Sequence, residues 1–225
     1  MHDWKKIAAK IGPLRYQASE SDCVPTTIVN GLVFLLQRRI HPRLLQMIWS
    51  VSIESKHGTG CVTSRALSEI LNSWFKVAAE DGYEDDVMPY ESRVIEGESV
   101  HLARNNALVR AINTGGVCCL TVGGGTHYIL LHGMDGRNFL AFDPYWKRRK
   151  GAVAQRDLSD EYFGLVNTRF TRDELVDELS NDYNKWVQVI MPIDLTRLPL
   201  VALIGALFYN EPADIWVFLG AAVIF

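Results

Sequence analysis

The stretch HYILLHGMDGRNFLAFDPY, from His127 to Tyr145, contains two apolar runs separated by a short polar turn. Short apolar runs bounded by Gly, Asn and Pro are typical of β-strands, so this stretch predicts a β-hairpin. We expect a three-residue loop, Met134–Gly136, because such loops need a residue in the left-handed conformation and glycine adopts it readily. Gly133 then pairs with Arg137.

Counting outward from that loop pairs His127 with Asp143 at the open end of the hairpin. Directly paired residues share a face, with Cβ atoms about 5 Å apart, so the hairpin predicts an imidazole beside a carboxylate. A carboxylate there would fix the tautomer of the ring and stabilise the imidazolium. A two-residue loop, Asp135–Gly136, would instead pair His127 with Pro144, and a chance surface pair is the plainest alternative.

The same strand carries a second histidine, His132, five residues after His127. Strand residues alternate between faces, so only one of the two rings can face a given site. We interpret His132 as a structural residue on the opposite face, among Leu130 and Phe142. The remaining histidines occupy a tail, helix ends and a glycine-bounded loop and are weaker candidates for a base: His2, His41, His101 and His57.

Helical patterns fill the first half of the chain and strand patterns the second half. Apolar spacing predicts helices at Asp22 to about Arg39, Arg43 to Ser52, Thr63 to Phe75 and His101 to Asn113. Short apolar runs predict further strands at VCCLTV and WVQVIMP, and YEDDVMPYESRVIEGES predicts a surface loop or a short edge strand. This order indicates an α+β fold, with a helical N-terminal half packed on an antiparallel sheet.

The first predicted helix begins beside a cysteine. With Asp22 as N-cap and Pro25 in the first turn, Cys23 takes the first helical position. The helix dipole and the unpaired N–H groups there favour a thiolate over a thiol. The alternative is a buried, inert cysteine, which is the commoner state of a free cysteine when this position is judged alone.

A glutamine, Gln17, precedes Cys23 by six residues, across the sequence ASESD. A loop of that length can turn back and set the side-chain amide beside the sulfur. The amide would then join the backbone N–H of Cys23 as a second donor to an oxyanion. A solvated glutamine is the alternative, and it would be favoured if this residue stood alone.

Taken together, these motifs resemble the papain-like cysteine peptidases, and within them the bacteriocin-processing (double-glycine leader) peptidases and their stand-alone relatives. The resemblance covers roughly Ile11 to Phe170. It rests on QASESDC, on HGTG ahead of the amphipathic TSRALSEILNSWF, on HYILLHG and on AFDPY. The order, spacing and flanking residues of these motifs agree together.

The resemblance implies a papain-like cysteine peptidase fold and a role for each residue. Cys23 would be the nucleophile, His127 the base, Asp143 the residue that orients the base, and Gln17 the oxyanion donor. The sequence departs from the family where Val24 and Pro25 follow the cysteine in place of glycine and small residues. We expect this difference to crowd the oxyanion side or narrow the substrate cleft. The family's best-known members are also domains of peptide exporters, and no ATPase segment is present here.

Composition excludes several other functions. Lys and Arg total 23 and Asp and Glu 26, a net charge of −3, which argues against a nucleic-acid partner. We interpret the basic run Lys147–Lys150 as a solvated turn. The cysteines lack metal-ligand spacing, and no cofactor or metal is expected. Cys61 has no His–Asp pair placed for it, and we expect Cys118 and Cys119 to be core residues. Without a secretory signal at the N-terminus, we expect reduced thiols and a cytoplasmic location.

The composition changes near residue 195, which predicts a peptidase domain over 1–194 and an apolar appendage over 195–225. Its two apolar runs, LPLVALIGALFY and IWVFLGAAVIF, are each too short to span a bilayer as a helix, which takes about 20 residues. Three alternatives are open for this appendage. Residues 198–225 associate with a membrane at its inner face, are buried against another protein or a second copy, or begin a longer membrane region.

The leading hypothesis is a thiol hydrolase that cleaves a peptide or amide substrate through an acyl-enzyme. The same Cys, His and Asp set with an amine acceptor would make an acyltransferase of the transglutaminase type. A non-catalytic peptide-binding module with a papain-like fold is the alternative from a different class. The presence of all four site residues argues against that module, and Val24 is the feature that favours it.

Overall fold

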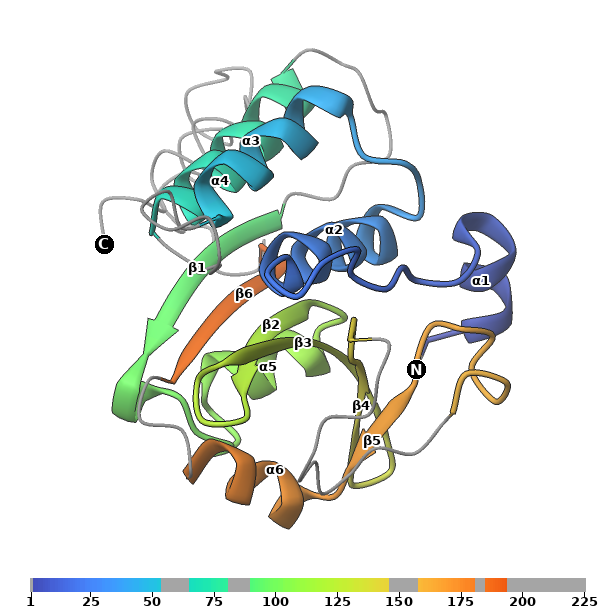
Figure 1. The fold of residues 1–225 in the computed structure, drawn as a ribbon, viewed down its shortest axis with the longest axis vertical. Helices are drawn as coiled ribbons and strands as arrows, with labels where there is room; N and C mark the ends of the chain where they lie inside the picture. Colours follow the sequence, from blue (N-terminus) through green and yellow to red (C-terminus); the bar gives the residue numbers. More distant parts are fainter. Residues whose placement is uncertain (1, 54–64, 81–89, 146–157, 181–184, 194–225) are drawn as a thin grey trace, which may run out of the picture. The chain divides into compact units, whose positions relative to one another are not determined.

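The computed structural model describes residues 2–53, 65–80, 90–145, 158–180 and 185–193. Their elements centre on an antiparallel sheet with strand order β1-β6-β2-β3-β4-β5 (Figure 1). The predicted α+β class is confirmed. The strands are β1 (Tyr90–Glu96), β2 (Val117–Val122), β3 (His127–Asp135), β4 (Asn138–Phe142), β5 (Thr168–Phe170) and β6 (Trp186–Pro192).

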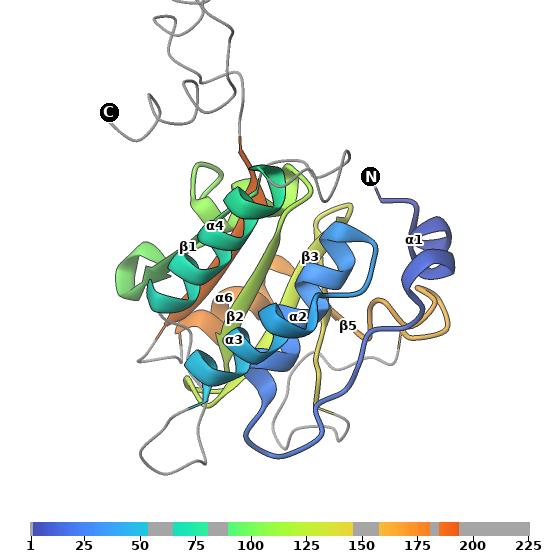
Figure 2. The same cartoon turned by 90° about the horizontal axis from the view of Figure 1, so that it is seen from above.

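Helices cover both faces of this sheet. The N-terminal helices pack on one face, as the sequence predicts, and two shorter helices pack on the other (Figure 2). The first group is α1 (Trp4–Ile11), α2 (Cys23–Leu36), α3 (Pro42–Ser52) and α4 (Arg65–Glu80); the second is α5 (Ala107–Asn113) and α6 (Arg172–Ser180). A short 3-10 helix, η1 (Gly97–Ser99), follows β1.

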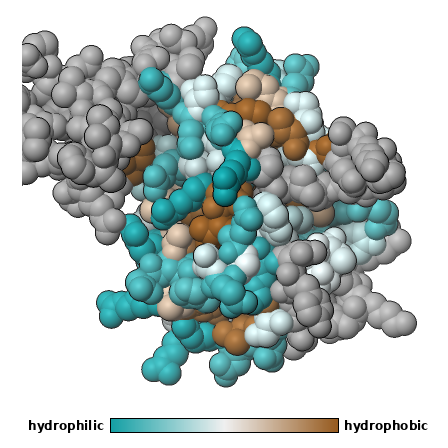
Figure 3. Space-filling model, turned by 90° about the vertical axis from the view of Figure 1, so that its left-hand side faces the viewer, coloured by the Kyte–Doolittle hydropathy of each residue, from teal (hydrophilic) through white to brown (hydrophobic). Residues whose placement is uncertain are grey.

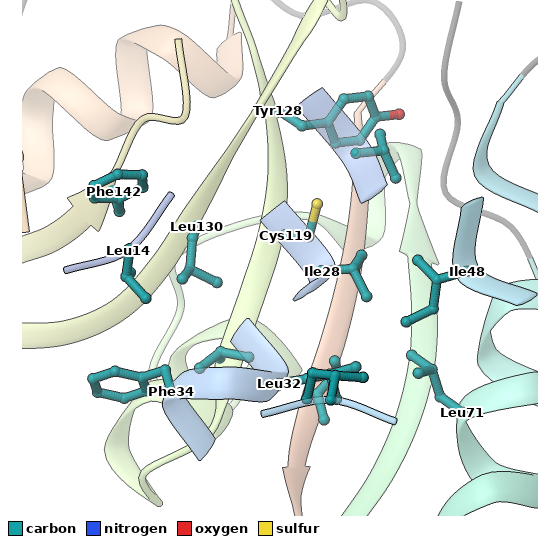
Figure 4. Packing of buried hydrophobic residues seen from close by; sticks show 14 of the residues in the cluster. Leu14, Ile28, Leu32, Phe34, Ile48, Leu71, Cys119, Tyr128, Leu130 and Phe142 are labelled. Atoms are coloured by element: carbon teal, nitrogen blue, oxygen red, sulfur yellow. The ribbon is translucent and has the colours of Figure 1, made fainter. Parts of the chain in front are cut away.

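Each face of the sheet has its own hydrophobic cluster, because alternate strand residues point to opposite faces. Figure 4 shows the α2 side, where Ile28 and Leu32 of α2 lie among side chains of the strands and of α3 and α4. Cys119 belongs to this cluster, whereas Cys118 belongs to the cluster beneath α5 and α6. Both thiols are buried, so their prediction as core residues is confirmed.

Helix α2 lies close against the sheet at a glycine. A Cβ atom on Gly31 would stand 3.0 Å from Cγ2 of Val117 and 3.2 Å from Cδ1 of Leu130. A larger residue would therefore require the side chains of Val117 and Leu130, or α2 itself, to shift by a few tenths of an ångström. This close approach fixes the height of α2, and hence of its first residue, above the strands.

Three predicted helix boundaries need correction, one of which is the end of α4, at Glu80 rather than at Phe75. Helix α2 ends at Leu36 rather than near Arg39, because Gln37 adopts the left-handed conformation with φ 50° and ends the helix there. Helix α5 begins at Ala107 rather than at His101, because Asn106 caps it by accepting a hydrogen bond from the N–H of Leu108 at 2.9 Å. The residues before it form a loop. β1 is an edge strand, one of the two predicted alternatives.

The hairpin of β3 and β4 forms with a register that differs from the predicted one. Its turn has two residues, Gly136 and Arg137, so that Asp135 pairs with Asn138. A β-bulge between Leu131 and Gly133 then takes up one extra residue, His132.

Beyond the bulge, Leu130 pairs with Phe142, the last residue of β4. Continued outward, this register sets His127 opposite Tyr145 rather than opposite Asp143, so the predicted direct pairing is wrong. The offset is two residues, which keeps His127 and Asp143 on one face as diagonal neighbours. Without the bulge the offset would be odd, and the two side chains would point to opposite faces.

Several predictions concern residues outside those that the structure describes: the loop with His57 and Cys61, the basic run 147–150 and the appendage 195–225. Among the described helices, none has the length and apolar character needed to cross a membrane. On the face of the molecule seen in Figure 3, hydrophilic side chains predominate and hydrophobic ones form patches between them.

Candidate functional site

The predicted contact between His127 and Asp143 is present. Nε2 of the imidazole lies 2.6 Å from Oδ1 of the carboxylate, and the two residues are 8% and 1% exposed. The same oxygen accepts the backbone N–H of Tyr145 at 2.9 Å, and the Tyr145 ring lies edge-on to the imidazole. A carboxylate is an acceptor, so Nε2 carries the hydrogen and Nδ1 is the basic nitrogen of the neutral ring.

Cys23 is the first residue of α2, as predicted, and is 4% exposed. One helical turn later, the hydroxyl of Thr27 donates to the carbonyl of Tyr128 at 3.4 Å. Tyr128 follows His127 directly, so this bond holds the first turn of α2 beside the start of β3. The structure thus brings the cysteine-bearing end of the helix to the end of the sheet where His127 and Asp143 meet.

Val24 follows Cys23 in the first turn of α2. Its side chain is 0% exposed and belongs to the hydrophobic cluster between α2 and the sheet. The expected crowding of the oxyanion side or narrowing of the cleft by Val24 and Pro25 stays a prediction. The α-helical geometry that presents Cys23 at the helix start turns the next side chain into the core.

Asp22 precedes α2 but makes no side-chain capping bond to it, which corrects its predicted role. Its carboxylate turns back and accepts hydrogen bonds from the backbone N–H groups of Ala18 and Ser19, at 3.0 and 2.9 Å, and from the Ser19 hydroxyl at 2.9 Å. The carboxylate is 3% exposed. It therefore fixes the shape of the loop between Gln17 and Cys23.

Gln17 is 5% exposed, so the solvated alternative is wrong. Its backbone N–H donates to the carbonyl of Pro144 at 2.8 Å, and its Nε2 donates to the carbonyl of Ser19 at 2.7 Å. The first bond ties the Gln17 loop to the residue after Asp143. The side-chain oxygen Oε1 is buried without a hydrogen-bond partner among the described residues, a state that costs about 1–3 kcal/mol.

Sequence reasoning missed Asn167, whose side chain holds the main chain of Asp143. Its Oδ1 accepts the N–H of Asp143 at 2.7 Å and its Nδ2 donates to the carbonyl of Asp143 at 2.8 Å. Asn30 makes the same pair of bonds to the backbone of Arg15, at 3.0 and 2.8 Å. Neither asparagine lies in a recognisable motif, and Asn167 is 24 residues away from Asp143 in sequence.

The second histidine of β3 is structural, as predicted, although its surroundings differ from the expected ones. His132 is fully buried, with its ring edge-on to Trp4 and Phe34 and its Nε2 2.9 Å from the carbonyl of Leu165. The pKa of His132 is lowered to about 4, mainly by burial and also by the neighbouring His2, against the raising effect of the carbonyl contacts. Burial likewise raises the pKa of the Cys118 thiol.

No group of three or more His, Cys, Asp or Glu side chains able to hold a metal occurs among the described residues. A cavity of about 480 Å³ lies against the outer side of α2, between Lys10–Arg15 and Arg38–Ile40. The four candidate residues do not line this cavity, so the candidate site is elsewhere.

No family model matches the chain, and no curated protein matches it. Among solved structures it is similar to a double glycine motif protease from an AMS/PCAT transporter in complex with the leader peptide: 11% identity, TM-score 0.45, covering 80% of this chain and 91% of that one. It is also similar to the peptidase domain of Streptococcus ComA, a bi-functional ABC transporter involved in quorum sensing: 15% identity, TM-score 0.42, covering 80% and 98%.

Proposed function

We propose that this chain is a papain-like cysteine peptidase, a thiol-dependent hydrolase that cleaves a peptide or amide bond through an acyl-enzyme on Cys23. The observation that carries the proposal is the short contact between His127 and Asp143 beside the first turn of α2. A buried imidazole bonded to a buried carboxylate, at the end of a helix that begins with cysteine, is the arrangement that thiol catalysis needs.

In the proposed reaction, Nδ1 of His127 takes the thiol proton of Cys23, because Nε2 is bonded to Asp143. The sulfur attacks the carbonyl carbon of the substrate and gives a tetrahedral oxyanion. Collapse of this intermediate breaks the C–N bond, and the imidazolium gives its proton to the leaving amine. A water molecule, deprotonated by the same ring, then attacks the thioester and releases a carboxylic acid and the thiol.

Gln17 is the proposed side-chain donor to the oxyanion, together with the backbone N–H of Cys23. An amide nitrogen carries two hydrogens, and the bond to Ser19 uses one of them. Exchanging the amide N and O would set two acceptor oxygens against each other at Ser19, so the donor orientation is fixed. The buried, unpartnered Oε1 supports a site whose polar groups find further partners when substrate binds.

The experiment is an incubation of the wild type and of Cys23→Ala with peptide and acyl-amine libraries, with the products read by mass. We expect new carboxyl termini with the wild type and none with the variant. Products joined to an amine would show acyl transfer by the same residues. Retention of peptide without any product would instead support the non-catalytic binding module and contradict the proposal.

A second measurement tests the thiolate itself. Iodoacetamide at mildly acidic pH should alkylate Cys23 well ahead of Cys61, Cys118 and Cys119. The helix start and the imidazole base favour the reactive thiolate at Cys23. Equal or faster labelling of the other cysteines would contradict an activated Cys23.

A further inference from the structure

Asp143 lies where the sheet ends. β4 stops at Phe142, and the last residue pairs on its two sides are Leu130 with Phe142 and Ala141 with Thr168. The main chain of Asp143 is therefore outside both ladders. Its N–H and carbonyl are nevertheless both bonded, because the Asn167 amide stands in the place of a neighbouring strand.

We propose that Asn167 is a positioning residue: its side-chain amide fixes the main chain of Asp143 so that Oδ1 points at Nε2 of His127. An aspartate has only two side-chain torsions, so the position of its carboxylate follows closely from the position of its backbone. The contact between Oδ1 of Asp143 and Nε2 of His127 is 2.6 Å long, so a small shift of the Asp143 backbone would lengthen this hydrogen bond. The inference rests on the proposed function for its catalytic consequence.

The amide orientation of Asn167 follows from its partners. A backbone N–H can only donate and a backbone carbonyl can only accept, so Oδ1 must face the N–H of Asp143 and Nδ2 its carbonyl. Oδ1 also accepts the hydroxyl of Thr168 at 3.0 Å, which locks the side chain further. Asn167 is itself held by the bond from its N–H to the carbonyl of Ala141 at 3.1 Å.

The chain contains a matched control for this interaction. Asn72 of α4 makes the same two bonds to the backbone of Ser92 in β1, at 2.9 and 2.6 Å. β1 is the edge strand farthest in sheet order from β4 and β5, and neither Asn72 nor Ser92 is a candidate site residue. Replacing Asn72 removes the same chemistry without touching the segment that carries Asp143.

The test compares Asn167→Ala and Asn72→Ala by three readouts. The first is the downfield proton resonance of the His127 ring N–H, which reports the bond to Asp143 by NMR. The second is the rate of Cys23 alkylation across pH, and the third is thermal unfolding. We expect both variants to melt a few degrees lower, because each loses two hydrogen bonds to a backbone and Asn167→Ala also loses the bond from the Thr168 hydroxyl.

Only Asn167→Ala should weaken or shift the ring N–H resonance and slow alkylation at mildly acidic pH, by about tenfold to a hundredfold. Asn167→Asp keeps the acceptor but sets a carboxylate oxygen against the carbonyl of Asp143, so it should disturb the resonance and alkylation at least as much. If Asn167→Ala unfolds, Asn167→Asp carries the same comparison.

Equal effects of the Asn167 and Asn72 variants on the resonance and on alkylation would overturn the positioning role and leave a merely structural one. The resonance does not depend on chemistry at Cys23. An unreactive wild-type Cys23 with a resonance that is lost only in the Asn167 variants would therefore refute the proposed function while supporting the positioning role.

Discussion

The two histidines of β3 lie on one strand, five residues apart, in opposite kinds of site. His132, at the bulge, is fully buried, and its ring nitrogens face the carbonyls of Leu130 and Leu165. His127, at the open end of the hairpin, is bonded to the carboxylate of Asp143. Burial among aromatic rings favours a neutral ring at His132, against the raising effect of its carbonyl partners on the pKa, whereas a carboxylate accommodates the imidazolium.

The difference shows that residue type and strand position do not decide the role of a histidine. The burial of the ring and the partners at its nitrogens decide it together. His132 joins β3 to the segment around Leu165 and to the rings of Trp4 and Phe34, which makes it part of the core. His127 has the partner that a proton-transfer residue requires.

Replacing each histidine by glutamine tests the difference between the two rings and should have the largest effect. His127→Gln should lower the rate of peptide hydrolysis by about 10³-fold, equivalent to about 4 kcal/mol, because it removes the base. His132→Gln should leave the turnover of the folded fraction within a few-fold of the wild type and instead lower the melting temperature. Steady-state kinetics and thermal unfolding of both variants measure these effects. An active His127→Gln enzyme would contradict the assignment of the base.

The second prediction concerns the pH dependence of the free energy of unfolding, to which His132 should contribute because its pKa is lowered. An unfolded histidine takes up a proton below its ordinary pKa of 6.5, whereas the pKa of buried His132 is about 4. Between these values the unfolded state binds more protons. Stability is therefore lost as pH falls from about 6.5 to about 4, by about 3 kcal/mol.

Urea unfolding at a series of pH values checks this expectation against His132→Gln, in which the contribution of His132 should be absent and only that of His2 should remain. His127→Gln should keep both. His2, whose own pKa burial lowers, lies beside His132 and adds to the same acid loss. Parallel pH curves for the wild type and His132→Gln would show that His132 is not the titrating group.

The contact at the open end of the hairpin follows from sequence, but the register that produces it does not. Strand alternation and Gly136 predict the hairpin and the shared face of His127 and Asp143. In the structure, a shorter turn and a bulge at His132 together place the two side chains on that face. The bulge depends on tertiary contacts, such as those of His132 with Leu165, that no local pattern encodes.

The candidate site likewise contains residues that the sequence predicts and contacts that only the folded structure shows. Spacing and helix-start chemistry predict Cys23 and Gln17 because both lie in one short segment. The carboxylate of Asp22 turns toward the loop rather than the helix because three donors of Ala18 and Ser19 converge on it, which is known only once the loop is folded. Asn167 acts across the sheet end, and long-range side-chain bonds of this kind have no sequence signature.

The smallest expected effects are those on stability when Gly133 and Gly136, the two glycines near the turn, are each replaced by alanine. A Cβ on Gly133 would lie 2.8 Å from Cη2 and 2.9 Å from Cζ2 of Trp4, so Gly133→Ala must displace a rigid indole ring that also contacts His132. Overpacking of this kind lowers the free energy of unfolding by about 1–3 kcal/mol.

Gly136→Ala meets no atom within 4 Å but must hold alanine at φ 60°, a strain of about 1 kcal/mol. Urea unfolding of the two variants measures both costs. We expect Gly133→Ala to be the less stable, because its clash reaches the core contact of His132 whereas the strain at Gly136 stays in the solvent-facing turn. The reverse order would mean that the turn, rather than the packing around the bulge, determines the stability of this hairpin.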